Sequence, residues 1–249
     1  MVRVRRGVYI LPSLLTLGNL FCGYASILYA MRGNLEIAAP LIGIAIVLDM
    51  LDGRIARLTG TTSAFGLEFD SLADIISFGI APAILMFQWG LQPLNRLGWA
   101  VGFIYVTAAA MRLARFNIQS ASALDKRFFV GLPSPAAAAI PASTAYFYPP
   151  GFADRPGAFI AAVVMVVPAL LMVSTIRFRS FKADMRVSRS YKVLALLAIV
   201  IAVVQWHPPT VLLVLAYAYL TWGVSSWAWT RLRRRSPEPR SAPETPAAE

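Results

Sequence analysis

Long apolar stretches, separated by short polar connections, run through almost the whole chain. A helix needs about 20 consecutive apolar residues to cross the hydrocarbon core of a bilayer. Hydrophobic residues make up 58% of the 249 and charged residues only 14%, and the mean hydropathy of +0.63 is far above that of an average soluble domain. The sequence therefore predicts an all-α integral membrane protein with about eight transmembrane helices, at residues 9–31, 35–56, 68–89, 97–116, 132–150, 156–176, 192–206 and 209–229.

The basic residues predict the orientation of these helices, because cytoplasmic loops of membrane proteins collect Lys and Arg. If the N-terminus is cytoplasmic, every one of the 23 Lys and Arg residues except Arg32, Arg96 and Arg155 falls on the cytoplasmic side. Both termini are then cytoplasmic. The expected location is the cell membrane, as a multi-pass protein of a prokaryotic cytoplasmic membrane.

The net charge of +11 follows from this orientation and does not indicate nucleic-acid binding. Lys and Arg next to membrane spans attract anionic lipid headgroups and anionic substrates. The predicted partner is the lipid bilayer, and no nucleic-acid partner is predicted. The proline-rich segment 236–249 has too few apolar residues to fold and is predicted to be a disordered cytoplasmic tail, which leaves residues 1–235 as one membrane domain.

Carboxylates interrupt the apolar pattern at the end of the second predicted span and the start of the third. Asp49 and Asp52 lie three residues apart and share one face of a helix, and Asp70 and Asp74 lie four apart and share a face of the next. Glu68 points away from that face and is left out of the site. A charge within a membrane costs several kcal/mol unless something compensates it, so this cluster predicts a bound cation.

Carboxylate oxygens are the ligands that Mg²⁺ and Mn²⁺ prefer. Asp49, Asp52, Asp70 and Asp74 are therefore the predicted metal ligands, and because four carboxylates overcompensate one divalent cation, two ions are expected. This places the predicted active site between the second and third spans, at the cytoplasmic side. Two divalent cations suit displacement at phosphorus, in which a carboxylate removes the proton from an incoming alcohol.

Two other interpretations of the acidic cluster remain open. In one, the acids are structural and are neutralised by protonation or by Arg57. In the other, the protein is a cation transporter whose carboxylates form an ion path. The transporter explains the acids, but not the neighbouring Arg57 or their clustering at one membrane face, since transporter sites lie near the midplane.

The spacing of the cluster, D-x2-D-G-x2-A-R-x8-G-x3-D-x3-D, resembles the signature of the CDP-alcohol phosphotransferases. Every fixed position of that signature holds the required residue: Asp49, Asp52, Gly53, Ala56, Arg57, Gly66, Asp70 and Asp74. The resemblance implies that Gly53, Ala56 and Arg57 contact the CDP moiety. It also implies that Gly66 lets the two helices close around that moiety.

Four further segments are similar to the membrane-embedded phosphatidylserine synthases of this family: residues 19–24, 68–83, 114–117 and 129–136. The implied reaction transfers the phosphatidyl group from CDP-diacylglycerol to L-serine, giving phosphatidylserine and CMP in phospholipid biosynthesis. The resemblance also implies that Asp70 and Asp74 are catalytic, with Asp74 both assisting the metal ligands and deprotonating the serine hydroxyl. A homodimer is the assembly that it implies.

Three other polar residues are candidates for substrate contacts. Arg112 and Arg115 share a face at the cytoplasmic end of the fourth span, where they could meet a phosphate or the serine carboxylate, or could simply anchor the helix. Asn19 could reach the nucleotide or hydrogen-bond a neighbouring helix. The same site could also serve another acceptor, glycerol 3-phosphate or inositol phosphate, and a phosphorylated acceptor would need basic residues such as Arg112, Arg115 and Lys126 in the pocket.

Overall fold

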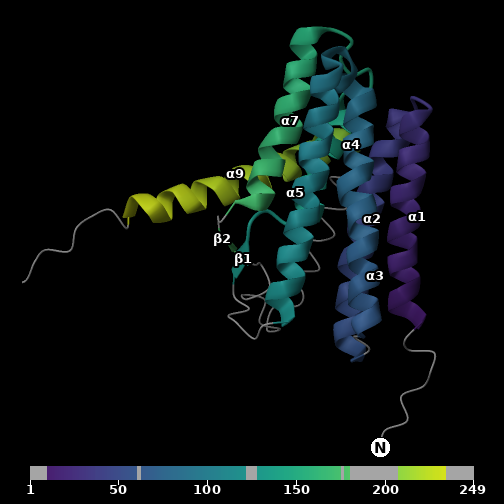
Figure 1. Cartoon of the computed structure of the whole chain (residues 1–249), viewed down its shortest axis with the longest axis vertical. Coiled ribbons are helices and arrows are strands. Elements are labelled where there is room, and N and C mark those ends of the chain that lie inside the picture. The colour runs from purple at the N-terminus through teal and green to yellow at the C-terminus, as the bar shows by residue number, and fades with distance from the viewer. Residues whose placement is uncertain (1–9, 61–62, 122–127, 175–176, 180–206, 234–249) are drawn as a thin grey trace, which may run out of the picture.

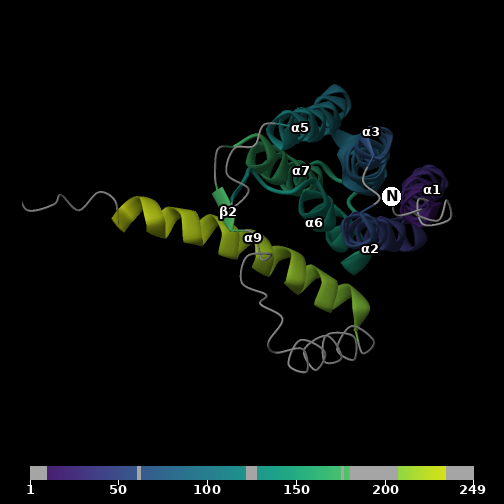
Figure 2. The same cartoon turned by 90° about the horizontal axis from the view of Figure 1, so that it is seen from below.

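A bundle of long helices makes up most of the computed structural model, which describes residues 10–60, 63–121, 128–174, 177–179 and 207–233. Helices α1, α2, α5 and α7 run roughly along the long axis of the molecule, and α9 lies across the bundle (Figures 1 and 2). The bounds of the long helices are α1 Ile10–Met31, α2 Leu35–Thr59, α5 Arg96–Ala121, α6 Ser134–Phe147, α7 Arg155–Val173 and α9 Pro208–Arg233.

Between α2 and α5, a helical stretch of changing pitch runs from Ala64 to Leu94. It consists of α3 (Ala64–Asp74), the π-helix η2 (Ile75–Ile80), α4 (Ala81–Met86), the π-helix η3 (Phe87–Leu91) and the short 3-10 helix η4 (Gln92–Leu94). Wider π turns inside helices often mark functional sites. The first of them begins directly after Asp74, so the helix changes its register immediately beyond the carboxylates.

One cap marks the end of α2 and another marks the start of α3. Gly60 ends α2 in the left-handed conformation, with its N–H donating to the carbonyl of Ala56. Ser63 then caps α3, where its Oγ accepts from the N–H of Gly66 at 3.0 Å. These caps fix the end of α2 and the start of α3, the two helices that carry the acids.

Small residues allow the helices of the bundle to pack closely. Ala38, Ala39 and Ala45 of α2 are almost fully buried, and a Cβ added at Gly23 of α1 would lie 2.8 Å from the Cα of Ser77 in η2. Close packing of small residues is the usual way in which membrane helices associate. Large apolar side chains such as Phe21 of α1 are instead exposed on the outside of the bundle, as lipid-facing side chains would be.

A two-stranded antiparallel ladder joins β1 (Phe128–Val130) to β2 (Arg177–Arg179), with Phe129 opposite Phe178. The sequence did not predict it. The ladder ties the segment before α6 to the segment after α7. The connection continues into Leu132, whose N–H donates to the carbonyl of Leu171 at 3.0 Å.

Five helices of the described chain are long and apolar enough to cross a bilayer: Pro12–Met31, Ala64–Leu94, Arg96–Ile118, Arg155–Val173 and Pro208–Ser225. The prediction of an all-α membrane protein is confirmed at this level, apart from the short ladder. Helix α2, at the predicted second span, carries several charged side chains, and α6, at the predicted fifth, has only 14 residues; neither is among the five. The predicted seventh span, 192–206, and the predicted tail, 236–249, lie outside the described residues.

Candidate active site

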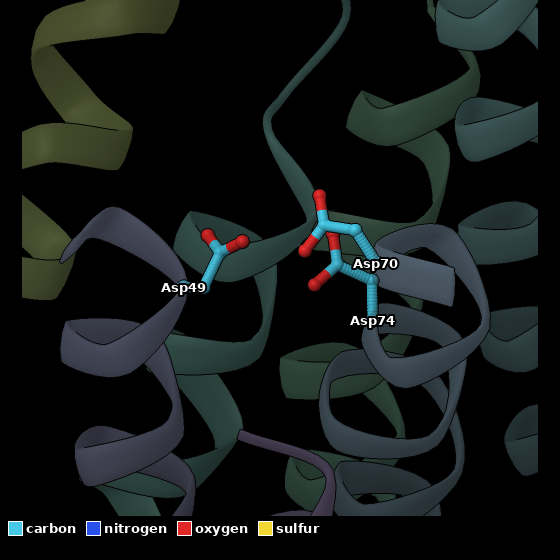
Figure 3. A group of neighbouring side chains, drawn as sticks. All are labelled: Asp49, Asp70 and Asp74. Carbon is cyan, nitrogen blue, oxygen red and sulfur yellow. The ribbon is translucent and has the colours of Figure 1, made fainter. Parts of the chain in front are cut away.

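Carboxylates from two helices converge where α2 approaches α3. Figure 3 shows Asp49 on α2 facing Asp70 and Asp74 on α3. Each of the three offers an oxygen that lies within 4.8 Å of the oxygens of the other two. Asp74 is buried, and Asp49 and Asp70 are half-buried. Of the four acids that were predicted to come together from the second and third spans, the structure brings three close to one another.

The chemistry of this cluster fits a divalent cation. Asp70 has a buried oxygen, Oδ1, with no hydrogen-bond partner in the described part of the chain, and leaving such an oxygen unsatisfied costs about 1–3 kcal/mol or more for a charged group. Three carboxylates so close together also repel one another in a medium of low dielectric constant. A bound Mg²⁺ or Mn²⁺ would remove both costs at once.

Asp52, the fourth predicted ligand, is not one of the three converging carboxylates. Its side chain is buried, and its Oδ2 accepts a hydrogen bond from Thr16 Oγ1 of α1 at 2.9 Å. It still interacts electrostatically with Asp70. The structure thus ties Asp52 to α1, and its role as a metal ligand stays a prediction.

Asn19 lies at the site, on α1. Its Nδ2 donates to Oδ1 of Asp74 at 3.3 Å, and its main-chain carbonyl accepts from Ser77 Oγ at 3.0 Å. The Asn19 side chain is fully buried, yet its own Oδ1 has no partner among the described residues. Asn19 therefore contacts a neighbouring helix, as one of the two predictions for it expected, and keeps an acceptor next to Asp74.

Two arginines of α5 differ in where they lie. Arg112 interacts electrostatically with Asp74 and Asp49, its Nη1 donates to Ser134 Oγ at 2.5 Å, and its guanidinium lies 5.7 Å from the ring centre of Phe116. Arg115 instead donates through Nη1 to the carbonyl of Val173, at the end of α7, at 3.4 Å. Arg112 therefore contacts Ser134 at the start of α6 and interacts electrostatically with the carboxylates, whereas Arg115 contacts the end of α7.

The residues expected to meet the CDP moiety lie around the α2–α3 turn. Arg57 is exposed in the last turn of α2, and a Cβ added at Gly53 would lie 3.7 Å from its guanidinium. Ala56 is half-buried one residue before Arg57. In the described part of the chain, a Cβ added at Gly66 would meet only Ser63 Oγ, at 3.0 Å, and the contact observed for Gly66 is the hydrogen bond from its N–H to the capping Ser63.

Sequence reasoning gave no role to two features of the site. The first is Ser134, which accepts a hydrogen bond from Arg112; it lies within the segment 129–136 that carries part of the resemblance, but no contact was predicted for it. The second is a pair of reciprocal contacts between Ser71 of α3 and Asn117 of α5, at 3.0 and 3.3 Å. Asn117 belongs to the segment 114–117. Neither partner could be found from sequence because each contact joins residues far apart in the chain.

A bundle of apolar helices with an acidic metal site is typical of a membrane enzyme that transfers phosphate-linked groups. Comparison with known protein families supports this class. The family model described as CDP-alcohol phosphatidyltransferase matches residues 9–173. The chain belongs to this family, as its acidic signature predicted.

Several relatives are similar over much of their length. The CDP-diacylglycerol–serine O-phosphatidyltransferase of Helicobacter pylori is 37% identical over 231 residues, which is 91% of this chain and 94% of that protein. An archaetidylserine synthase of Methanothermobacter thermautotrophicus is 38% identical over 170 residues, covering 68% of this chain and 69% of its own. The CDP-diacylglycerol–serine O-phosphatidyltransferase of Bacillus subtilis is 31% identical over 172 residues, covering 69% of this chain and 91% of its own.

Proposed function

We propose that this protein transfers the phosphatidyl group from CDP-diacylglycerol to L-serine, giving phosphatidylserine and CMP. The observation that carries the proposal is the convergence of Asp49, Asp70 and Asp74 within a membrane-helix bundle. The acceptor is inferred from the relatives, because those of H. pylori and B. subtilis are named for transfer to serine and the archaeal one for an archaetidylserine product. The reaction belongs to phospholipid biosynthesis.

The three converging carboxylates would hold Mg²⁺ or Mn²⁺, and Asp52 is proposed to join them when two ions bind. When bound, such ions neutralise charge on the diphosphate and orient the leaving group. Holding three carboxylates in one place requires that their helices be fixed. The hydrogen bonds from Thr16 to Asp52 and from Asn19 to Asp74 do this by joining α1 to both acid-bearing helices.

The bond changes assign a role to Asp74. The serine hydroxyl oxygen forms a bond to the lipid-side phosphorus, the bond from that phosphorus to the CMP oxygen breaks, and the hydroxyl proton goes to a carboxylate. Asp74 is the proposed proton acceptor, with Asp70 beside it. Asn19 donates to one oxygen of Asp74, which holds that carboxylate in a fixed orientation for the transfer.

The positive side chains around the carboxylates are proposed to bind the anionic parts of both substrates. Arg112 interacts electrostatically with Asp74 and Asp49 and is the proposed contact for a phosphate or the serine carboxylate. Arg115, which contacts α7, is proposed as a further contact. Gly53, Ala56, Arg57 and Gly66 are proposed to lie along the CDP moiety. An arginine binds such oxyanions through two parallel N–H donors of its planar fork.

The membrane arrangement is also part of the proposal. With both termini and the active site on the cytoplasmic side, soluble serine and the released CMP have direct access to the carboxylates. We also propose that the protein has eight spans, inserts into a prokaryotic cytoplasmic membrane and assembles as a homodimer.

The proposal is tested by supplying purified protein with CDP-diacylglycerol and labelled serine. The expected result is a labelled lipid with the mass of phosphatidylserine, formed with Mg²⁺ or Mn²⁺ and lost after chelation by EDTA. Restoring the metal should restore the product. Label that stays in the aqueous phase under every metal condition would contradict serine as the acceptor.

A further inference from the structure

Ser134 is the side chain that accepts a hydrogen bond from Arg112. It begins α6, is fully buried, and its Oγ accepts from Arg112 Nη1 at 2.5 Å. A hydrogen bond to a charged group is stronger than one between neutral groups and more sensitive to geometry. The second contact of the guanidinium, with the ring of Phe116, restrains the same group from α5 itself.

The start of α6 does not explain why this position holds a serine. The N-cap residue is Pro133, with no side-chain hydrogen bond to the helix, and the Ser134 side chain turns to Arg112 instead. A buried hydroxyl without a partner would be destabilising. The helix continues with four alanines, 136–139, and an alanine at position 134 would also fit the helix without burying a hydroxyl. The hydroxyl of Ser134 is therefore best explained by its contact with Arg112.

The loop that presents Ser134 is fixed to the end of α7. Gly131 has a φ of +87°, and a Cβ added there would lie 2.3 Å from the carbonyl oxygen of Met172. The next residue, Leu132, donates its N–H to the carbonyl of Leu171. A side chain held by such a loop has a defined position, which is what a residue needs in order to orient another group.

We propose that Ser134 is a positioning residue that fixes the plane of the Arg112 guanidinium for binding an oxyanion of the substrates. The inference rests on the proposed function, because it takes the substrates from there. The oxyanion is either the carboxylate of the acceptor serine or a phosphate of the CDP-linked lipid. Either one is bound through a planar fork whose orientation decides how many hydrogen bonds form.

The test measures the KM of each substrate separately in the full-length protein, in detergent–lipid micelles with Mn²⁺. Ser134→Ala removes the acceptor for Arg112 without adding volume. The matched control is Ser143→Ala in the same helix: Ser143 is also buried, but its hydroxyl donates to Ile140 within α6 at 3.1 Å. Thermal unfolding of each variant reports on the stability of the bundle.

The expected result for Ser134→Ala is a rise of about tenfold in one KM, with kcat within about twofold and unfolding as in the Ser143→Ala control. A higher KM for serine identifies the carboxylate as the bound group, and a higher KM for CDP-diacylglycerol identifies the phosphate. Both results support the positioning role.

Three results would overturn it: both KM values unchanged, a loss confined to kcat, or the same change in Ser143→Ala. The unsubstituted protein separates this failure from failure of the proposed function. If that protein forms phosphatidylserine and Ser134→Ala has unchanged KM values, only the positioning role is wrong. If it forms none, the proposed function is wrong.

Discussion

At the residue scale, Asp49, Asp70 and Asp74 repel one another when all three are ionised, because their oxygens lie within 4.8 Å in surroundings of low dielectric constant. This repulsion destabilises the fold when no cation is bound, and it also favours the binding of a cation. Removing one carboxylate should therefore weaken metal binding without weakening the bundle.

Asp70→Asn is expected to lower metal-dependent turnover by at least about a hundredfold, because a metal site of this kind supplies several kcal/mol of transition-state stabilisation. The melting temperature in detergent should be unchanged or higher, since one repelling charge is gone. The measurement is CMP release under saturating substrates, with thermal unfolding of the same sample. Glu68→Gln, an exposed acid two residues earlier on α3, serves as the control and should keep its activity; near-normal turnover of Asp70→Asn would contradict the metal site.

The sequence located the acids of this site but not all of their neighbours. Helical spacing placed Asp70 and Asp74 on one face, and the structure has them together. The same spacing placed Asp52 with Asp49, but Thr16 of α1 holds Asp52 by a hydrogen bond across 36 positions of sequence. Helical spacing predicts which residues share a face of one helix. It does not predict hydrogen-bond partners on other helices, such as Thr16 on α1 or Ser134 on α6.

At the element scale, α1 supports the site by packing against η2 with almost no space between them. Gly23 faces Ser77, whose hydroxyl donates to the carbonyl of Asn19, and Asn19 donates in turn to Asp74. The contact between the two helices is therefore linked to the orientation of a catalytic carboxylate.

Gly23→Ala is expected to separate α1 from η2, because the new Cβ would lie 2.3 Å from Ser77 Oγ and 2.8 Å from Ser77 Cα. We expect a destabilisation of about 1–3 kcal/mol, typical of overpacking, together with lower activity. Gly43→Ala in α2 is the control, since a Cβ added there has no neighbour within 4 Å. Thermal unfolding of both variants tests this; equal melting temperatures would show that α1 does not pack as described.

Gly131→Ala is expected to disturb the loop before α6 for two reasons: a positive φ and a Cβ 2.3 Å from the carbonyl oxygen of Met172. The control is Gly33→Ala, where φ is +77° but nothing lies within 4 Å, so only the conformational cost of about 1–2 kcal/mol applies. Gly131→Ala should lower both stability and activity by more than Gly33→Ala does. Matched unfolding and CMP-release assays measure this, and equal effects would contradict the packing of the loop on α7.

Apolar runs predicted most of the long helices but not their internal irregularities. The predicted third span, 68–89, lies within the helical stretch Ala64–Leu94, whose two π-helices leave no pattern in hydropathy. The ladder between Phe128–Val130 and Arg177–Arg179 was also missed, because each strand has three residues and its partner lies beyond two helices. Such short, non-local pairing depends on the packed bundle rather than on local sequence.

At the scale of the whole molecule, the distribution of Lys and Arg predicts on which side of the membrane the site opens. The α2–α3 turn should face the cytoplasm, and the α1–α2 turn should face the opposite side. Five helices of the described chain are apolar and long enough to span the membrane.

Labelling of single cysteines in intact cells tests this orientation. In a Cys22→Ala background, which removes the one native cysteine, Asn34→Cys in the α1–α2 turn should react with a membrane-impermeant maleimide added outside the cells. Leu58→Cys, near the end of α2 and 85% exposed in the native protein, should react only after the membrane is opened. The reverse pattern would place the active site on the outer face.

The most direct test of the account is release of CMP from CDP-diacylglycerol by purified protein, with serine, glycerol 3-phosphate and inositol phosphate offered separately, with and without Mg²⁺ or Mn²⁺. The account predicts that CMP is released only when the metal is present, and only when serine is the acceptor. Release with a different acceptor would keep the site and change the substrate. No metal-dependent release with any acceptor would contradict the assignment of this acidic cluster as a phosphatidyl-transfer site.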